Sequence, residues 1–265
     1  MLEEVAISAM PMIKIIRQRM TTPMKPLLLL SVFLLSSCSP PPDVPSEKLV
    51  ERQGITYKIN STTPFTGTSV QFHNNGQLRV RGSHKDGKRE GLWEYYHENG
   101  QLELRGNYRD GKGEGLYEGF YENGELKSRL TYKDGKLEGL SEYYHENGQL
   151  ELKGNYRDGK GEGLYERFHE NGALKSRLTY KDGKLEGLYE EFHENGQLTE
   201  TRAYKDGIEQ NRTVFTYHEN GQLKSRGNVK DGNMDGLWEW FDEDGQLETR
   251  GNLKDGELLD VSPKD

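Results

Sequence analysis

Residues 91–114 read GLWEYYHENGQLELRGNYRDGKGE, and this 24-residue stretch is copied about eight times along the chain. Each copy carries one Asn-Gly pair and one Asp-Gly pair, about half a repeat apart. The glycines of the first pair, in the last copy preceded by Asp244, are Gly76, Gly100, Gly124, Gly148, Gly172, Gly196, Gly221 and Gly245. A fixed period of this length is typical of a repeat array, in which each unit packs only against its neighbours.

Asn-Gly and Asp-Gly between alternating apolar residues are strong signals for β-hairpins. Two turns in every repeat leave about seven to nine residues for each strand, which is an ordinary strand length. The repeats show no helical spacing of apolar residues. The sequence therefore predicts an all-β fold, an elongated array of stacked antiparallel β-hairpins with about eight 24-residue repeats in a single twisted sheet.

The turn length sets which side chains share a face of this sheet. A three-residue loop at 98–100, with Gly100 in the left-handed region, places Leu102 opposite Tyr96 and keeps the leucines together. The same loop length is expected at the Asp-Gly turns. The apolar face predicted in this way carries Leu92, Tyr96, Leu102, Leu104, Gly106 and Tyr108.

The opposite face then receives an exposed strip of aromatic residues, with Arg105 opposite Trp93 in a cation–π arrangement. Glu94 and its copies fall on the apolar face, where the pattern offers no explanation for them. Because aromatic residues are favoured at protein-binding hot spots, the strip is the candidate binding surface. Its members are Trp93, Tyr95, Tyr117, Tyr143, Tyr165, Tyr189, Trp238 and Trp240. The alternative is that these rings only stabilise the sheet.

One copy of the repeat, which begins near Gly207, is irregular. It contains one extra residue, and Asn211 replaces the glycine of the usual Glu-Gly-Leu motif. The sequence predicts a kink or bulge there, at the single place where the surface is not repeated.

The composition agrees with a repeat array and argues against nucleic acid as a partner. Only 32% of the residues are hydrophobic, below the usual ~45–50% of globular domains, as expected for an array without a large core. The formal net charge is −8, and acidic and basic residues are interspersed. Without a basic stripe to follow a phosphate backbone, nucleic acid is not an expected partner.

The N-terminal region has the features of an export signal over residues 1–37. The apolar run 27–35 follows Lys25 and is too short to span a bilayer. Residues 1–19 carry acidic residues ahead of the basic ones, which indicates a true start at Met20 or Met24. The stretch 35–38, Leu-Ser-Ser-Cys, resembles a bacterial lipobox, in which Cys38 is lipidated; an ordinary signal peptide with an incidental cysteine is the alternative.

The remaining boundaries follow from composition and period. Residues 38–47 are expected to form the lipidated cysteine and a Pro-rich spacer, and 48–66 an N-terminal cap. Residues 67–256 hold the repeats, and 257–265 form a short acidic tail.

Six histidines stand just before the Asn-Gly turns: His73, His97, His145, His169, His193 and His218. Successive copies lie two strands apart, about 9.5 Å, which is too far for neighbours to bind one zinc ion. We expect solvated, turn-flanking histidines and no metal site. Because a catalytic pocket must be singular and identical copies are not, we also expect no catalytic residues and no cofactor.

The repeat pattern Tyr/Phe-x-Glu-Asn-Gly-Gln-Leu … Gly-x-Tyr-Lys-Asp-Gly-Lys-x-Glu-Gly resembles the MORN-repeat variant of bacterial proteins, often named YwqK-type antitoxins. The resemblance covers about residues 67–256 and implies stacked β-hairpins in an elongated sheet. The antitoxin name implies a protein that neutralises a toxin, whereas MORN repeats elsewhere act as membrane-associated scaffolds.

Together these features predict a non-enzymatic, lipid-anchored protein of the bacterial cell envelope, at the outer membrane or cell surface. It is expected to act as a scaffold that binds a protein partner and to contact the membrane through its lipid anchor. An antitoxin or immunity protein is the first alternative, and a protein that binds cell-wall glycan is the second.

Overall fold

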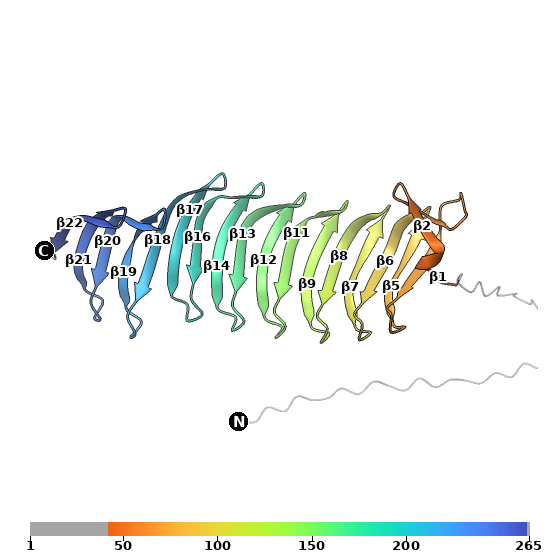
Figure 1. Cartoon of the computed structure of the whole chain (residues 1–265), viewed down its shortest axis with the longest axis horizontal. Helices are drawn as coiled ribbons and strands as arrows, with labels where there is room; N and C mark the ends of the chain where they lie inside the picture. The colour runs from red at the N-terminus through yellow and green to blue at the C-terminus, as the bar shows by residue number, and fades with distance from the viewer. Residues whose placement is uncertain (1–41, 264–265) are drawn as a thin grey trace, which may run out of the picture. The chain divides into compact units, whose positions relative to one another are not determined.

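The computed structural model describes residues 42–263, and the expected signal peptide and Cys38 lie outside the described residues. The predicted all-β fold is confirmed, because the described part forms one sheet of 20 strands and a separate two-stranded hairpin. From β4 to β22 the strands stand in a single row in chain order (Figure 1). The hairpin strands of the first repeats are β4 (Gly67–Phe72), β5 (Leu78–Lys85), β6 (Lys88–Tyr96), β7 (Leu102–Arg109), β8 (Lys112–Phe120) and β9 (Leu126–Lys133).

The strands of the middle and last repeats continue the row in chain order. Their strands are β10 (Lys136–Leu137), β11 (Gly139–Tyr144), β12 (Leu150–Arg157), β13 (Lys160–Phe168), β14 (Leu174–Lys181), β15 (Lys184–Leu185), β16 (Gly187–Phe192), β17 (Leu198–Lys205), β18 (Ile208–Tyr217), β19 (Leu223–Lys230), β20 (Asn233–Phe241), β21 (Leu247–Lys254) and β22 (Glu257–Pro263). The segment expected as an acidic tail thus contains strand β22, which pairs with β21.

The N-terminal end of the row is closed by a short cap. Strand β1 (Val44–Pro45) pairs in parallel with β4, although the sequence placed it in a free spacer. A 3-10 turn, η1 (Ser46–Lys48), leads into the hairpin of β2 (Leu49–Arg52) and β3 (Ile55–Lys58). Within residues 42–263 no helix has the length and apolar character needed to cross a membrane.

The two kinds of turn differ. The three-residue Asn-Gly loop is confirmed: Gly100 has φ 84° and donates its N–H to the His97 carbonyl at 2.9 Å. The three-residue expectation is wrong for Asp-Gly, where Asp110 and Gly111 alone connect paired neighbours and both have positive φ, 50° and 81°. This is the two-residue type I′ geometry, whose twist matches that of the flanking strands.

The predicted division of side chains between the two faces is wrong, because the pairing of the strands shifts by one residue after the Asn-Gly turn. Tyr96 does oppose Leu102, but the ladder then skips a residue, so that Tyr95 opposes Leu104. Trp93 therefore opposes Gly106, not Arg105. The rings expected on the exposed strip lie on the same face of the sheet as Leu104. We call this face the aromatic face. A bulge just after the turn, invisible in the apolar pattern, causes the difference.

A second bulge occurs at each Glu-Gly-Leu motif. Asn107 opposes Glu114 while its neighbour Gly106 opposes Tyr117, so two residues of β8 have no partner on β7. The first of them, Gly115, has φ 80°, a conformation that favours glycine. This bulge restores the register that allows an aromatic ring to face a glycine.

The core is built from aromatic rings that lie against glycines of the preceding strand. A Cβ on Gly106 would lie 2.3 Å from the Tyr117 ring, so only glycine leaves room for it. The Tyr117 hydroxyl donates to the carbonyl of Asn107 at 2.8 Å, next to the register shift. Burial raises the pKa of Tyr117, which therefore stays a donor. The same contact recurs at Gly82–Trp93, Gly154–Tyr165 and Gly227–Trp238.

One of the intervening repeats fills the same layer differently. Leu130 stands where others have glycine, and Ser141 replaces the ring on the next strand and is 0% exposed. Here the larger side chain, Leu130, is on β9 and the small one, Ser141, is on β11, the reverse of the order in the glycine–ring pairs. This exchange keeps the packing volume nearly constant. Leu178 also replaces the glycine, but the next strand keeps a ring, Tyr189, which is half-buried instead of buried.

The second face carries alternating acidic and basic residues, and we call it the charged face. Arg105 opposes Glu94 and donates to Glu118 at 2.6 Å, and Arg129 reaches Glu118 and Glu142 at 3.7 and 3.8 Å. These contacts explain the glutamates that the sequence pattern could not place. Exposed ion pairs contribute about 0–1 kcal/mol each, so the ladder contributes less than the ring layer.

Side chains at the turns join each hairpin to the next. His97 donates from Nε2 to the Phe120 carbonyl at 3.0 Å, and Tyr121 makes the equivalent bond to Tyr144 at 2.7 Å. The expectation of merely solvated histidines is therefore wrong for His97. It is also wrong for the other histidines with this bond, His73, His145, His169 and His218.

His84 packs the cap against the first repeat. Its ring lies between Phe65 and Trp93, at centroid distances of 5.4 and 5.1 Å, and is 8% exposed. Burial, and secondly the charge of Arg89, lowers the pKa of His84 to about 4. The following four repeats have tyrosine at this position.

The ring layer generates a stability prediction. Gly106→Leu should destabilise the chain by about 2–4 kcal/mol, because the new side chain meets the Tyr117 ring. The double change Gly106→Leu with Tyr117→Ser copies the natural Leu130–Ser141 pair and should recover most of the loss. Urea unfolding measures both, and a double variant no more stable than the single one would contradict the exchange of volume.

A pH dependence follows from the lowered pKa of His84. Below about pH 6.5 the unfolded chain gains a proton that the folded chain refuses until about pH 4, so folding stability falls as pH falls through this window. The free energy of unfolding should change between about pH 4.5 and pH 7 by about 2 kcal/mol less in His84→Tyr than in the unchanged chain. An unchanged difference in urea unfolding at the two pH values would show that His84 titrates normally.

Candidate functional site

The eight aromatic residues of the predicted strip do lie on one face, but they form two rows. Trp93, Tyr117, Tyr165 and Trp238 make the buried row and are only 3–8% exposed. The expectation of an exposed strip is wrong for these four, which form the core layer. The second row is half-buried and consists of Tyr95, Tyr143 and Trp240. Tyr189 stands at the repeat position of the buried row, but it is half-buried as well.

The half-buried rings lean on the core rings. Trp240 stacks on Trp238 at a centroid distance of 6.1 Å, and Tyr95 lies 6.4 Å from Trp93. These contacts support the alternative in which the aromatic residues stabilise the sheet.

A row of exposed leucines on the charged face was missed by the sequence reasoning, which placed these residues in the core. Each follows the positive-φ glycine of a Glu-Gly-Leu bulge, and each is 46–52% exposed. The row consists of Leu92, Leu116, Leu140, Leu164, Leu188 and Leu237. Neighbours in consecutive repeats are separated by two strands, about 9.6 Å.

The partners of these leucines across the sheet are small or polar. Leu92 opposes Asn107, Leu116 opposes Thr131 and Leu188 opposes Ala203. The leucines therefore have little apolar surface to pack against within the sheet. A signal for them was present in the sequence, since Glu-Gly-Leu recurs at a fixed place that the alternating pattern does not require.

The irregular copy is the second distinctive place, and the predicted bulge is present there. Asn211 opposes Ala203 while Glu209 opposes Tyr204, so β18 has one unpaired residue in place of the usual two. No leucine projects from this bulge; Ile208, at 67% exposure, lies beside the turn instead. The leucine row is thus regular only from Leu92 to Leu188.

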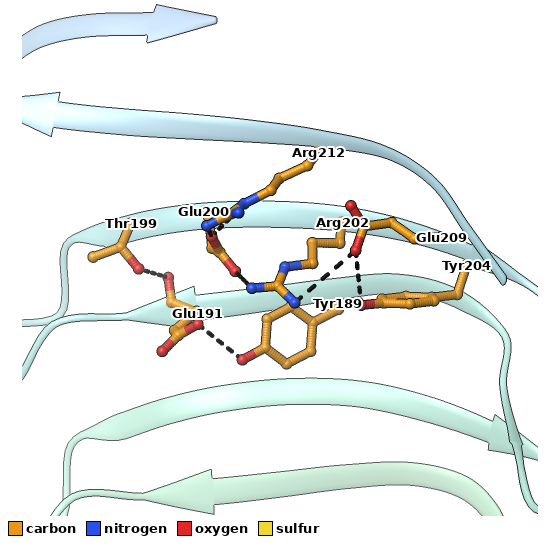
Figure 2. Close-up of polar contacts among 8 residues, drawn as sticks. All are labelled: Tyr189, Glu191, Thr199, Glu200, Arg202, Tyr204, Glu209 and Arg212. Carbon is orange, nitrogen blue, oxygen red and sulfur yellow. Dashed lines mark hydrogen bonds and ion pairs between the residues drawn. The ribbon is translucent and has the colours of Figure 1, made fainter. Parts of the chain in front are cut away.

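A buried ion cluster occupies the aromatic face at this copy. Glu200 is 6% exposed and accepts hydrogen bonds from Arg212, whose Nε is 2.8 Å away. It also forms an ion pair with Arg202. Figure 2 shows the Glu200 carboxylate between the two guanidinium groups. At the position of Glu200 the other repeats have valine, leucine, serine or threonine. This copy buries a charge there, which costs desolvation unless the pairing is complete.

Tyrosines complete the cluster. The Arg202 guanidinium lies over the Tyr189 ring at 5.4 Å, and the Tyr189 hydroxyl donates to Glu191 at 2.9 Å. Burial first, and the Glu191 carboxylate second, raises the pKa of Tyr189 to about 12. Glu209 accepts from Tyr204 at 3.3 Å and lies 4.0 Å from Arg202 (Figure 2). Through the hydrogen bonds between Arg212 and Glu200, the cluster joins β17 to β18 in the irregular copy.

Between residues 42 and 263, no three His, Cys, Asp or Glu side chains are grouped closely enough to hold a metal ion. In five copies the turn histidine uses Nε2 for a hydrogen bond to a backbone carbonyl.

The comparison with protein families agrees with the repeat geometry. The family model described as "MORN repeat variant" matches eight consecutive segments: 65–86, 89–110, 113–134, 137–158, 161–182, 185–206, 213–231 and 234–255. The shortened seventh match coincides with the irregular copy. No curated protein matches the chain in sequence.

Solved structures show only distant likeness. A variant of S. aureus TarM is 14% identical with a TM-score of 0.25, over 36% of this chain and 19% of TarM. The GtfA/B complex is 14% identical with a TM-score of 0.18, over 50% of this chain and 23% of that one. TcdB2-TccC3-TEV is 12% identical with a TM-score of 0.22, over 77% and 13%. The chain therefore spans less than a quarter of each of these proteins.

The ion cluster can be compared with a regular ion pair by the same substitution. Glu200→Gln should destabilise the chain by about 1–3 kcal/mol, because two partly buried arginines lose their shared carboxylate. Glu239→Gln, on the exposed charged face, should cost less than about 1 kcal/mol. Equal losses in urea unfolding would contradict a special role of the buried cluster.

Proposed function

The chain belongs to the MORN repeat variant family, and we propose that it is a non-enzymatic, lipid-anchored scaffold of the bacterial envelope that binds a protein partner. Membership supports the repeat scaffold, while the anchor rests on the Leu-Ser-Ser-Cys stretch that ends at Cys38. The absence of catalysis is proposed because the array presents the same side chains again and again, whereas a catalytic pocket is singular.

The observation that carries the proposal is the leucine row. Single exposed apolar residues are ordinary on a protein surface, but five leucines at one position of five consecutive repeats form a stripe. Each leucine is raised by a bulge that interrupts the sheet and requires a glycine with positive φ. The bulge that sets the register of the ring layer thus also holds the stripe at the surface along five repeats, where a partner can reach it.

The spacing of the row favours a helical partner. Consecutive leucines are separated by about 9.6 Å, and a helix advances about 10.5 Å in seven residues. A helix that lies along the row can therefore bring apolar residues seven apart to neighbouring leucines, since the two spacings differ by only about 0.9 Å. The ion-paired ladder beside the row adds little affinity, since its charges already have partners.

Affinity capture and cross-linking test the function directly. A photo-reactive residue at Leu164 of the full chain, expressed in its own organism, should cross-link one envelope protein that contains an amphipathic helix. Leu140→Ser, Leu164→Ser and Leu188→Ser together should reduce its capture at least about tenfold and leave the β circular dichroism unchanged.

The matched control changes equally exposed apolar residues elsewhere. Leu258→Ser with Leu259→Ser, on β22, should capture the partner as well as the unchanged chain does. Capture undiminished by the three leucine changes would contradict the proposal. A captured toxin would instead support the antitoxin alternative, and binding only to purified wall glycan would support the second alternative.

A further inference from the structure

A cavity of about 470 Å³ lies between the N-terminal cap and the aromatic face of the first repeats. The cap contributes Leu49 and Val50, and strands β5 and β6 contribute His84, Arg89 and Tyr95. This volume is within the range of small-ligand sites. The leucine row lies on the opposite face, so the cavity is independent of the function proposed above.

Two residues that line the cavity depart from the repeat. His84 occupies a position that is tyrosine in the next four repeats: Tyr108, Tyr132, Tyr156 and Tyr180. Its cross-strand neighbour Arg89 occupies a position that is glycine or leucine in those repeats: Gly113, Leu137, Gly161 and Leu185. The first repeat has thus acquired a histidine and an arginine where the array otherwise needs neither.

Arg89 is held firmly without a carboxylate. Its guanidinium lies 4.4 Å from the centre of the Trp93 ring, and Nη1 donates to the hydroxyls of Tyr95 and Tyr108 at 3.0 and 3.3 Å. No carboxylate among the described residues forms an ion pair with it, whereas Arg105 and Arg177 on the charged face each have one. A guanidinium fixed in this way is suited to bind a planar anion.

His84 supplies a second observation that points to a ligand. It is 8% exposed, and its Nδ1 has no hydrogen-bond partner within residues 42–263. Buried polar atoms in folded proteins nearly always have a partner, and this one belongs to a residue of the cavity wall. Leu49, Val70 and Val80 provide apolar surface in the same wall, which also carries the Arg79 guanidinium and the carboxylates of Glu51 and Glu103.

We propose that this cavity binds a small ligand with one carboxylate and an apolar body. Arg89 holds the carboxylate, His84 makes one further hydrogen bond, and the aliphatic residues of β4, β5 and the cap pack the body. The alternative is that His84 and Arg89 only pack the cap onto the sheet, which predicts no ligand binding.

Matched pairs of acids and amides test the charge requirement. The probes are N-acetyl derivatives of glycine, leucine and phenylalanine, each as the free acid and as the neutral amide. Calorimetry with the full chain in detergent should show binding of the leucine or phenylalanine acid, and about 10- to 100-fold weaker binding of its amide. No binding of any acid, or equal binding of acid and amide, would overturn the proposal.

Variants place the acid at Arg89. Arg89→Gln should weaken binding of the acid about 10- to 100-fold, and Arg105→Gln, a matched change on the charged face, should leave it unchanged. Exchange protection of the Gly87 N–H, which donates to the Phe65 carbonyl at 2.8 Å, reports whether the cap is intact. If Arg89→Gln opens the cap, Arg89→Lys is measured in its place. An unchanged affinity for the acid, in either variant with an intact cap, would overturn the role of Arg89.

Discussion

The contact between an aromatic ring and a glycine of the preceding strand is the constraint on which the rest of this array depends. A single-layer sheet has no second layer to cover its core, so burial must come from side chains lying on the sheet itself. Trp238 is only 3% exposed because Gly227 has no side chain, so the ring can lie directly on the strand. The ring nitrogen or hydroxyl then donates to a carbonyl beside the register shift, which ties packing and hydrogen bonding together.

This contact sets the character of both faces. The two bulges in each repeat bring the glycine under the ring, and the second bulge turns the leucine of Glu-Gly-Leu outward. The surface that we propose for binding is therefore a by-product of the geometry that packs the core. At Glu200 and Arg202 the array buries ions in place of this contact, and the leucine row is interrupted at the irregular bulge of the next strand, β18.

The fold class, the repeat length and the Asn-Gly loop were predictable from sequence, because period and turn chemistry are local properties. The faces were not, because one skipped residue near Tyr96 exchanges them and leaves the alternation of apolar residues intact. The cavity could be suspected only at His84 and Arg89, which break the repeat. The cap, which forms the other wall of the cavity, has no repeat from which its position could be deduced.

Ring-current shifts of glycine α-protons test the central contact most directly. In an NMR spectrum of the full chain, the α-protons of Gly106 and Gly154 should be shifted strongly upfield, because the Tyr117 and Tyr165 rings cover them. The α-protons of Gly115 and Gly163, with nothing within 4 Å of their Cβ positions, should show no such shift. Ordinary shifts at Gly106 and Gly154 would contradict the ring-on-glycine layer and, with it, the division of faces.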